Sequence, residues 1–351
     1  MEARRPLRTL YPGVSAFAQA TPVVVGPGDE RSGTNIRLVS GETHHIRGVL
    51  VGLTSADQGS VTIHPAEEEQ VFIALGGANY KADGSFDFPA LGPGSYALTY
   101  FQVAGDTAKG ARRIVTVGDR DVNDVVLSVT NSATITGHIK IEGAPAESLK
   151  SIDFQKLGLS LSAADALVGP NARAAIQPDG QFVIKNIVPG RYVVRANPPA
   201  GTYVKSIRFG QADVRTQELD LNEGGSGEME IVYRYGLASV GGSIGGEGGA
   251  PVSGRIVLIP SVLDPLGRGL ILGASDASNA FLIKNVPPGS YRAYAFESID
   301  FAALQDPAVL KSLQSGGAEL DIAEGKQRSV VLHLTSSEDQ QRLIGIAKGQ
   351  Q

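Results

Sequence analysis

The chain has 351 residues, of which 42% are hydrophobic and 19% are charged, the proportions of an ordinary globular protein. Its formal net charge is −5 and its Lys and Arg residues form no cluster, so it lacks the electrostatic signature of a nucleic-acid-binding protein. No apolar run approaches the roughly 20 residues that a membrane-spanning helix needs. The absence of cysteine excludes thiol catalysis, zinc–thiolate sites and disulfides.

One pattern occurs three times, at residues 84–96, 180–192 and 279–291. Each copy has a phenylalanine, a Pro-Gly pair whose glycine follows 8 positions later, and a tyrosine 2 positions beyond that glycine. These signature residues are Phe86, Gly94 and Tyr96, then Phe182, Gly190 and Tyr192, then Phe281, Gly289 and Tyr291. The phenylalanines lie 96 and then 99 residues apart, and self-similarity at a fixed period indicates tandem units.

The segment 1–40 precedes the first copy and contains no signature. Its apolar stretches at 23–25 and 36–38 are separated by a glycine-rich turn, the layout of a pair of closing strands. We therefore interpret 1–40 as the closing strands of an incomplete upstream domain, with Met1 inside the end of an earlier unit. The alternative is a genuine N-terminal β-arm, because chain termini vary freely.

Three β-sandwich domains are predicted next, over 41–130, 131–236 and 237–335. Each begins with a strand centred on a glycine and ends with an apolar closing strand. The opening glycines are Gly48, Gly137 and Gly242. Alternation within the signature places its apolar residues on one face of a sheet. Many short strands between Gly and Pro turns predict an all-β fold of antiparallel, immunoglobulin-like sandwiches.

The connections can be predicted in the same way. Residues 83–84 and 179–180, both Asp-Gly, favour type I′ hairpin turns, with 279–280 as a weaker third copy. The Pro-Gly pairs fit type II turns. One short helix is expected to begin at Pro307 with Asp306 as its N-cap. The polar segment 336–351 is expected to be a flexible tail.

The signature, (D/N)-G-x-F-x-(I/F)-x-x-(L/I/V)-x-P-G-x-Y, closely resembles that of the carboxypeptidase regulatory-like domain, a transthyretin-like β-sandwich. The resemblance covers most of the chain; the copy at 180–192 matches best and the third departs at Ala280. It implies non-catalytic modules of bacterial envelope proteins, which accompany metallocarboxypeptidases, outer-membrane receptors and surface proteins. Related sandwiches are grouped with carbohydrate-binding folds, an implication of shape only, because function has to come from a site.

A zinc site is the sharpest enzymatic alternative, because His64 and Glu67 form an H-x-x-E pattern of the kind that metallocarboxypeptidases use. His64, however, aligns with Ile259 of the third unit, at the end of a strand. A zinc site also needs a third ligand, and His138 belongs to a different unit. We therefore expect no metal here, and a metallocarboxypeptidase-associated hydrolase is the least favoured function.

Two further patterns are weaker. Ser243 lies within a G-x-S-x-G match, but no helix follows it, whereas the nucleophile elbow of serine hydrolases needs a strand-to-helix turn. Asp119, Asp121 and Asp124 lack the spacing of a calcium-binding loop, so a solvated turn is favoured. We expect no catalytic, cofactor-binding or metal-binding residues.

Sugar binding is the second functional hypothesis. The chain has no tryptophan, but its non-signature tyrosines could contact a ligand from the surface. These candidate ligand contacts are Tyr80, Tyr100, Tyr203, Tyr235 and Tyr294. A carbohydrate-binding module would use them together with the variable loops between the opening strand and the signature.

The favoured function is that of a non-catalytic repeat protein which acts as a spacer, support or docking module of a cell-envelope or secreted protein. Its partners would be polysaccharide or other envelope proteins, not nucleic acid. The absence of cysteine favours an extracytoplasmic location, in the periplasm, at the cell surface or secreted. The first residues, however, lack the apolar core of a signal peptide.

Overall fold

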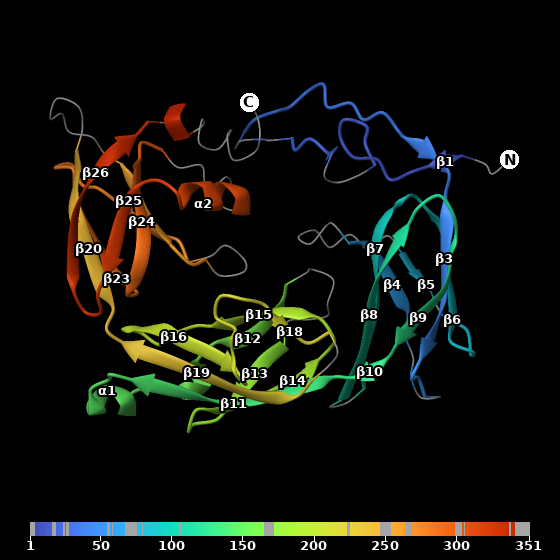
Figure 1. Cartoon of the computed structure of the whole chain (residues 1–351), viewed down its shortest axis with the longest axis horizontal. Helices are drawn as coiled ribbons and strands as arrows, with labels where there is room; N and C mark the ends of the chain where they lie inside the picture. Colours follow the sequence, from blue (N-terminus) through green and yellow to red (C-terminus); the bar gives the residue numbers. More distant parts are fainter. Residues whose placement is uncertain are drawn as a thin grey trace.

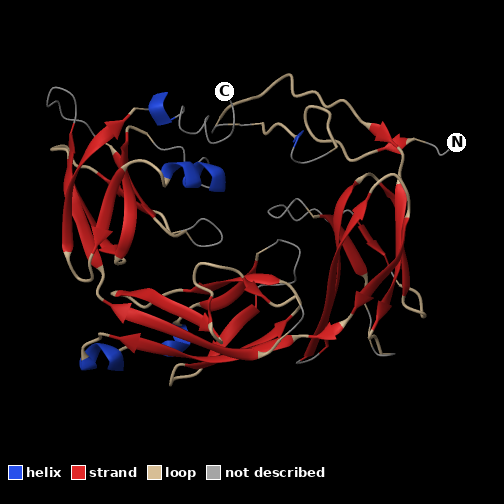
Figure 2. Ribbon diagram, viewed as in Figure 1, coloured by secondary structure: helices blue, strands red, loops and turns tan. Residues whose placement is uncertain are grey.

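The computed structural model is built almost entirely from β-strands (Figures 1 and 2). Helices in the described part of the chain include α1 (Ala146–Lys150), the 3-10 turn η2 (Phe154–Lys156) and α2 (Pro307–Leu313). None of the described helices has the length and apolar character that crossing a bilayer requires. The structure describes residues 4–15, 19–23, 25, 28–54, 57, 59–66, 76–78, 80–104, 107–164, 172–222, 225–245, 254–263, 269–298, 304, 306–336 and 338–340.

The first sandwich consists of two sheets that pack against each other. One has three strands in the order β6-β3-β9, and the other has five in the order β10-β8-β7-β4-β5. Its core includes Ile46, Phe86, Phe88, Leu98 and Leu127. The strands are β3 (His44–Val51), β4 (Val61–Pro65), β5 (Gly76–Ala78), β6 (Ser85–Leu91), β7 (Gly94–Ala104), β8 (Thr107–Val117), β9 (Val122–Ser128) and β10 (Thr130–Asn131).

The second sandwich is one continuous path of strands, in the order β17-β16-β19-β11-β14-β13-β12-β15-β18, that folds over a single core. That core includes Ile135, Phe182, Ile184, Tyr192 and Ile231. The strands are β11 (Ala133–Glu142), β12 (Leu159–Ala163), β13 (Ala172–Ile176), β14 (Gln181–Ile187), β15 (Arg191–Ala196), β16 (Thr202–Phe209), β17 (Ala212–Asp213), β18 (Leu219–Asp220) and β19 (Gly227–Tyr235).

The third sandwich follows the order β22-β21-β24-β26-β20-β23, with β25 also paired to β24. Helix α2 packs on the face of β21 and β24 that points away from the core between the sheets, and it buries Val309, Leu310 and Leu313 against Tyr294 and Phe296. The helix begins at Pro307, as predicted. The strands are β20 (Ala238–Gly245), β21 (Arg255–Pro260), β22 (Ile271–Ala274), β23 (Ala280–Val286), β24 (Gly289–Phe296), β25 (Ala318–Ile322) and β26 (Gln327–Thr335).

The predicted fold class, all-β with β-sandwich units, is confirmed. Most of the described strand pairs are antiparallel, but one parallel pair recurs in every unit: the opening strand pairs with the closing strand, β3 with β9, β11 with β19 and β20 with β26. A further short parallel contact joins β24 and β26. The domain boundaries at 130/131 and 236/237, and the tail at 336–351, stay predictions.

The strand pair expected at 23–25 and 36–38 is not formed among the described residues of 1–40, whereas the assignment of this segment to an upstream domain stays a prediction. The strands in the described part of this segment are β1 (Arg5–Pro6) and the start of β2 (Ser40–Gly41), which pair with each other. Val23, Val25, Ile36 and Leu38 are 44–70% exposed. Apolar alternation makes a strand only where a neighbouring sheet covers it, and here no described element does.

The opening glycines allow the parallel strand and the signature phenylalanine to approach closely. Gly48 lies opposite Phe86 in the ladder, and Gly137 lies opposite Phe182. A Cβ on Gly48 would lie 2.6 Å from Cζ of Phe86 and would overlap the carbonyl oxygen of Val125 on the closing strand. A Cβ on Gly137 would lie 2.5 Å from Cζ of Phe182. Only glycine leaves this space.

Each signature tyrosine forms a hydrogen bond to the turn that precedes its own strand. In each unit the hydroxyl donates a hydrogen bond to the carbonyl four residues earlier, as in the tyrosine corner of other β-sandwiches. The bonds join Tyr96 to Gly92 at 2.8 Å, Tyr192 to Val188 at 2.7 Å and Tyr291 to Pro287 at 2.8 Å. Burial raises the pKa of Tyr291 to about 12, so its hydroxyl stays a donor at neutral pH.

The turn types differ from those predicted. At the hairpin, Gly84, Gly180 and Asn279 have φ of 82°, 85° and 66°, and each follows a turn closed by a hydrogen bond to the carbonyl three residues earlier. This is a type I turn followed by a left-handed residue, because type I′ would need a positive φ at the preceding residue too. Asn279 therefore replaces the glycine without changing the turn.

The Pro-Gly pair is not a type II turn either. Gly94 and Gly289 have φ of 156° and 150°, far from the roughly +80° that this turn needs. The left-handed residue instead lies earlier, at a bulge in β6, β14 and β23 where the register against the opening strand shifts. In the first, second and third units this residue is Ala90, Asn186 and Asn285, with φ of 61°, 61° and 59°.

Substitution of the opening glycine tests the close approach of the strands. We expect Gly137→Ala to destabilise the second sandwich by about 3 kcal/mol or more, because the backbone of β19 or the Phe182 ring must move. Gly118→Ala is the matched control, since its Cβ would meet nothing within 4 Å. The measurement is urea unfolding of both variants; similar midpoints for the two would contradict the account.

The left-handed position in β6 offers a stabilising change. Ala90 is exposed, and alanine is strained where the other two units have asparagine. We expect Ala90→Asn to raise the free energy of unfolding of the first sandwich by about 0.5–1 kcal/mol, measured by chemical denaturation. Ala175→Asn is the control, because Ala175 lies in β13 without a positive φ and asparagine is unfavourable in strands. A gain in the control, or none at Ala90, would refute the assignment.

Candidate functional site

The second and third sandwiches are joined by a junction of two residues, Gly236 and Leu237, between β19 and β20. The amide of Gly325 donates to the carbonyl of Gly236 at 2.9 Å. Arg234, at the end of β19, places Nε 2.9 and 3.0 Å from the two carboxylate oxygens of Glu324 on the turn before β26. The turn of one sandwich is thus bound to the last strand of the other.

A second carboxylate extends this ion-pair network. Glu142 at the end of β11 accepts from Lys205 Nζ at 2.7 Å and from Arg234 Nη1 at 3.0 Å. The hydrogen bond from Lys205, and then that from Arg234, lowers the pKa of Glu142. The four side chains are 33–44% exposed, so each pair alone contributes little to stability. Their role is to connect the two sandwiches at a fixed place.

Beside this junction lies a groove formed by two adjoining hollows of about 730 and 480 Å³. Tyr203, Val204 and Pro287 line both hollows. The larger hollow is lined by β15, β16 and the Arg215 loop of the second sandwich, and by the end of β21 and the signature turn of the third sandwich. Its polar lining residues are Arg195, Asn197, Tyr203, Arg215, Thr216, Ser261, Ser290 and Tyr291.

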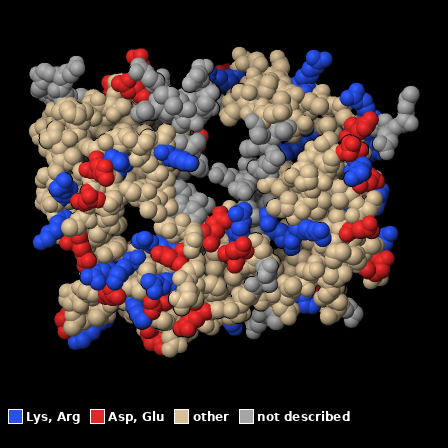
Figure 3. Space-filling view, in the orientation of Figure 1, with Lys and Arg blue, Asp and Glu red and all other residues tan. Residues whose placement is uncertain are grey.

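The groove is positively charged. Among the lining residues that the structure describes, the charged ones are Arg195 and Arg215, and none is Asp or Glu. The Arg215 guanidinium is exposed and forms no ion pair with any residue that the structure describes. Its charge acts on Tyr291, where it opposes the rise in pKa that burial causes. On the face in Figure 3, by contrast, Lys and Arg are interspersed with Asp and Glu.

The five tyrosines predicted as ligand contacts are not brought together. Tyr203 lines the groove. Tyr100 and Tyr294 are buried, and donate to Gln102 and to the carbonyl of Leu313, so they are not surface contacts.

The remaining two are half-buried and do not line the groove. Tyr80 donates to the carbonyl of Asp57 at 2.9 Å, and Tyr235 packs beside Gly201. Alternation along a strand cannot distinguish a tyrosine that faces solvent from one that packs at the edge of a core. The sequence analysis therefore placed all five tyrosines in one set of candidates.

The arginines of the groove were not predicted. Arg195 and Arg215 lie in the second sandwich, and the residues opposite them belong to the third, so no local pattern connects them. The one part of the groove that the sequence analysis had singled out is the third Pro-Gly turn, Pro288 and Gly289, which forms a wall of the groove.

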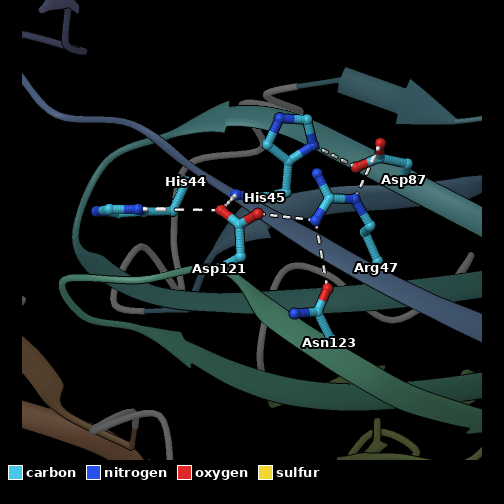
Figure 4. A network of polar contacts seen from close by, with 6 residues as sticks. All are labelled: His44, His45, Arg47, Asp87, Asp121 and Asn123. Atoms are coloured by element: carbon cyan, nitrogen blue, oxygen red, sulfur yellow. Dashed lines mark hydrogen bonds and ion pairs between the residues drawn. The ribbon is translucent and has the colours of Figure 1, made fainter. Parts of the chain in front are cut away.

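A polar network on the first sandwich is a further cluster of titratable groups (Figure 4). Arg47 Nη1 lies 2.7 Å from Asp121 Oδ2, and its Nε lies 3.5 Å from Asp87. His45 Nδ1 lies 2.7 Å from Asp87, and its amide donates to Asp121 at 2.9 Å. That amide bond, and then the bond from Arg47, lowers the pKa of Asp121. The carboxylates are thus engaged in joining β3 to β6 and to the start of β9.

The enzymatic candidates lie on strands. His64 is 2% exposed and pairs with Ala97, the residue after the signature tyrosine, just as Ile259 pairs with Arg292. Ser243 lies within β20, opposite Ala280. Glu67 lies outside the described residues.

No metal site is assembled in the described part of the chain, where no group of three or more His, Cys, Asp or Glu side chains could hold an ion. Asp121 binds Arg47 and does not converge with Asp119 and Asp124.

No family model matches the chain, and no curated protein matches it. Solved structures similar to it include a streptococcal ancillary pilin, at 11% identity and a TM-score of 0.29, covering 83% of this chain and 99% of that one. BcpA, the major pilin subunit of Bacillus cereus, matches at 9% identity and a TM-score of 0.23 over 83% of this chain and 99% of that one.

The Bacillus anthracis TIE protein matches at 9% identity and a TM-score of 0.22 over 83% of this chain. The match spans half of the length of that protein. Because all these scores are low, we base the functional proposal on the chain's own residues.

Proposed function

We propose that this chain is a non-catalytic, extracytoplasmic array of carboxypeptidase regulatory-like modules that acts as a spacer or support in a cell-envelope or secreted protein. The observation that carries the proposal is the construction of its junctions. Each sandwich passes into the next through one or two residues, and side chains of one unit pack on or bind to the other. A spacer has to hold its ends at a defined separation, and such junctions provide that.

The junction between the first and second sandwiches is a direct continuation of strands. Only Ser132 separates β10 from β11, and its amide donates to the carbonyl of Ala108 at 2.7 Å. Phe101 of β7 packs against the core of the second sandwich. Gly110 of β8 approaches the second sandwich so closely that a Cβ would lie 2.8 Å from side-chain carbons of Val188. Apolar contact thus supplements the short connection.

The junction between the second and third sandwiches is polar. Gly236 and Leu237 form the connection, and Arg234 holds Glu324 with two contacts from one nitrogen. Gly236 has a φ of 127°, a backbone conformation that favours glycine, and the Glu324 side chain lies close beside it. A charge-assisted contact across a two-residue connection restricts rotation more than it adds stability.

The non-catalytic part of the proposal is supported by how the reactive side chains are used. His64 and Ser243 occupy strand positions, and Asp87 and Asp121 hold strands together through Arg47. The location is supported by the cysteine-free sequence, which suits an oxidising compartment. Protease added to cells whose outer layers are permeabilised while the cytoplasmic membrane stays intact should degrade the protein; full protection there, with cleavage after lysis, would contradict an extracytoplasmic location.

Single-molecule energy transfer tests the fixed junction. Because the chain has no cysteine, Arg173→Cys on β13 and Leu282→Cys on β23 provide two unique dye sites in the second and third sandwiches. We expect one narrow distance distribution at low and physiological salt. Glu324→Gln should broaden it, because the bound turn is released.

Glu319→Gln is the matched control. Glu319 pairs with Arg292 inside the third sandwich, so the same charge is removed without touching the junction. The control should keep the narrow distribution. A broad distribution in the unmodified junction, comparable to that of a flexible linker, would reject the spacer proposal.

A further inference from the structure

We infer that the groove between the second and third sandwiches binds an acidic polysaccharide, a chain of sugars that carry carboxylate groups. This goes beyond a spacer role, and it gives the carbohydrate-binding hypothesis a place in the molecule. The groove unites residues that are distant in sequence, since its walls are β15 and β16 of one sandwich and the signature turn of the next.

The charge of the groove selects an anion. The described lining of the larger hollow contains two arginines and no carboxylate, in a chain whose net charge is −5. Arg215 is exposed beside the hollow and unpaired by any described carboxylate, so its planar donors are available to a ligand. Guanidinium groups match carboxylates with two parallel hydrogen bonds. Glu142 and Glu324, whose charges act on Tyr203 of the groove, are already bound to Lys205 and Arg234.

The other lining groups favour a sugar over a simple anion. Tyr203 contributes an aromatic side chain to both hollows, and an aromatic ring offers an apolar face together with a polar edge. Asn197, Thr216 and Ser261 add amide and hydroxyl groups that can exchange hydrogen bonds with sugar hydroxyls. This combination suits a ring that has an apolar face, hydroxyls around its rim and a carboxylate.

The shape of the groove favours a chain of sugars over a single one. The two hollows share Tyr203, Val204 and Pro287, and their volumes of about 730 and 480 Å³ each fall within the range of small-molecule sites. The arginines belong to the larger hollow, while the smaller one is lined by uncharged residues such as Pro199 and Asn285. A polymer could therefore place a carboxylate at the arginines and a neighbouring sugar beside Tyr203.

The test is a binding titration with the full chain and a fluorescently labelled hexamer of galacturonic acid. The expected result is saturable binding that weakens at higher salt. Arg215→Gln should weaken it by about tenfold or more, the loss expected for one charge-assisted contact.

Arg208→Gln is the matched control, because Arg208 is an exposed residue of β16 that does not line the groove. It should change the affinity less than twofold. Thermal melting of both variants checks that each is folded.

Two further probes decide the chemistry. Maltohexaose, which has the same length but no charge, should bind at least tenfold more weakly, and equal binding would overturn the requirement for carboxylates. Hexaglutamate should also bind more weakly; if it binds as well as the uronate hexamer and responds equally to Arg215→Gln, the groove is a site for acidic peptides and the sugar assignment is wrong. Absence of uronate binding at millimolar concentration, or equal losses in the two arginine variants, would overturn the inference altogether.

Discussion

Each sandwich depends on one close approach, in which the opening strand passes between the signature phenylalanine and the carbonyl of the closing strand. The residue at that point has to be glycine, because a Cβ would overlap a backbone oxygen that cannot move without breaking the parallel ladder. The positions are Gly48, Gly137 and Gly242. Since the opening and closing strands belong to opposite ends of a unit, this contact closes the unit and determines where the next one begins.

That closure also determines the junctions. A closing strand that lies beside the opening strand leaves the unit within one or two residues of the next opening strand, so neighbouring sandwiches have to touch. The first contact is apolar, through Phe101 and Val188, and the second is ionic, through Arg234 and Glu324. The groove follows from the second junction, because the signature turn around Pro288 faces strands of the preceding sandwich there. Spacing and ligand binding thus arise from the same arrangement.

The sequence predicted the fold well where the signal was periodic and local. The spacing of Phe182, Gly190 and Tyr192, repeated in the other copies, was enough to predict the β-sandwich architecture. It failed at 23–38, where apolar residues resembled strands but have no described neighbour to pair with. The turn types also escaped prediction, because a left-handed residue at Ala90 is invisible until the bulge in β6 is seen.

The groove could be predicted least. Arg195 and Arg215 face a turn about 75–95 residues later in the chain, and only the packing of two domains brings them together. Of the tyrosines proposed as ligand contacts, Tyr203 is the one that lines the groove, and nothing in its own neighbourhood distinguishes it from Tyr100. Composition and periodicity carry information about a core, whereas a site between domains depends on their relative placement.

Amide hydrogen exchange resolved along the chain is the most direct test of the central claim, that the glycine-centred parallel ladders close the units. The account predicts that the amides of β3, β11 and β20 and of their partners β9, β19 and β26 are among the slowest to exchange in each sandwich. The amides of β22 should exchange faster, because β22 lies at an edge of its sheet. Fast exchange in the closing strands, with protection confined to the signature hairpins, would contradict it.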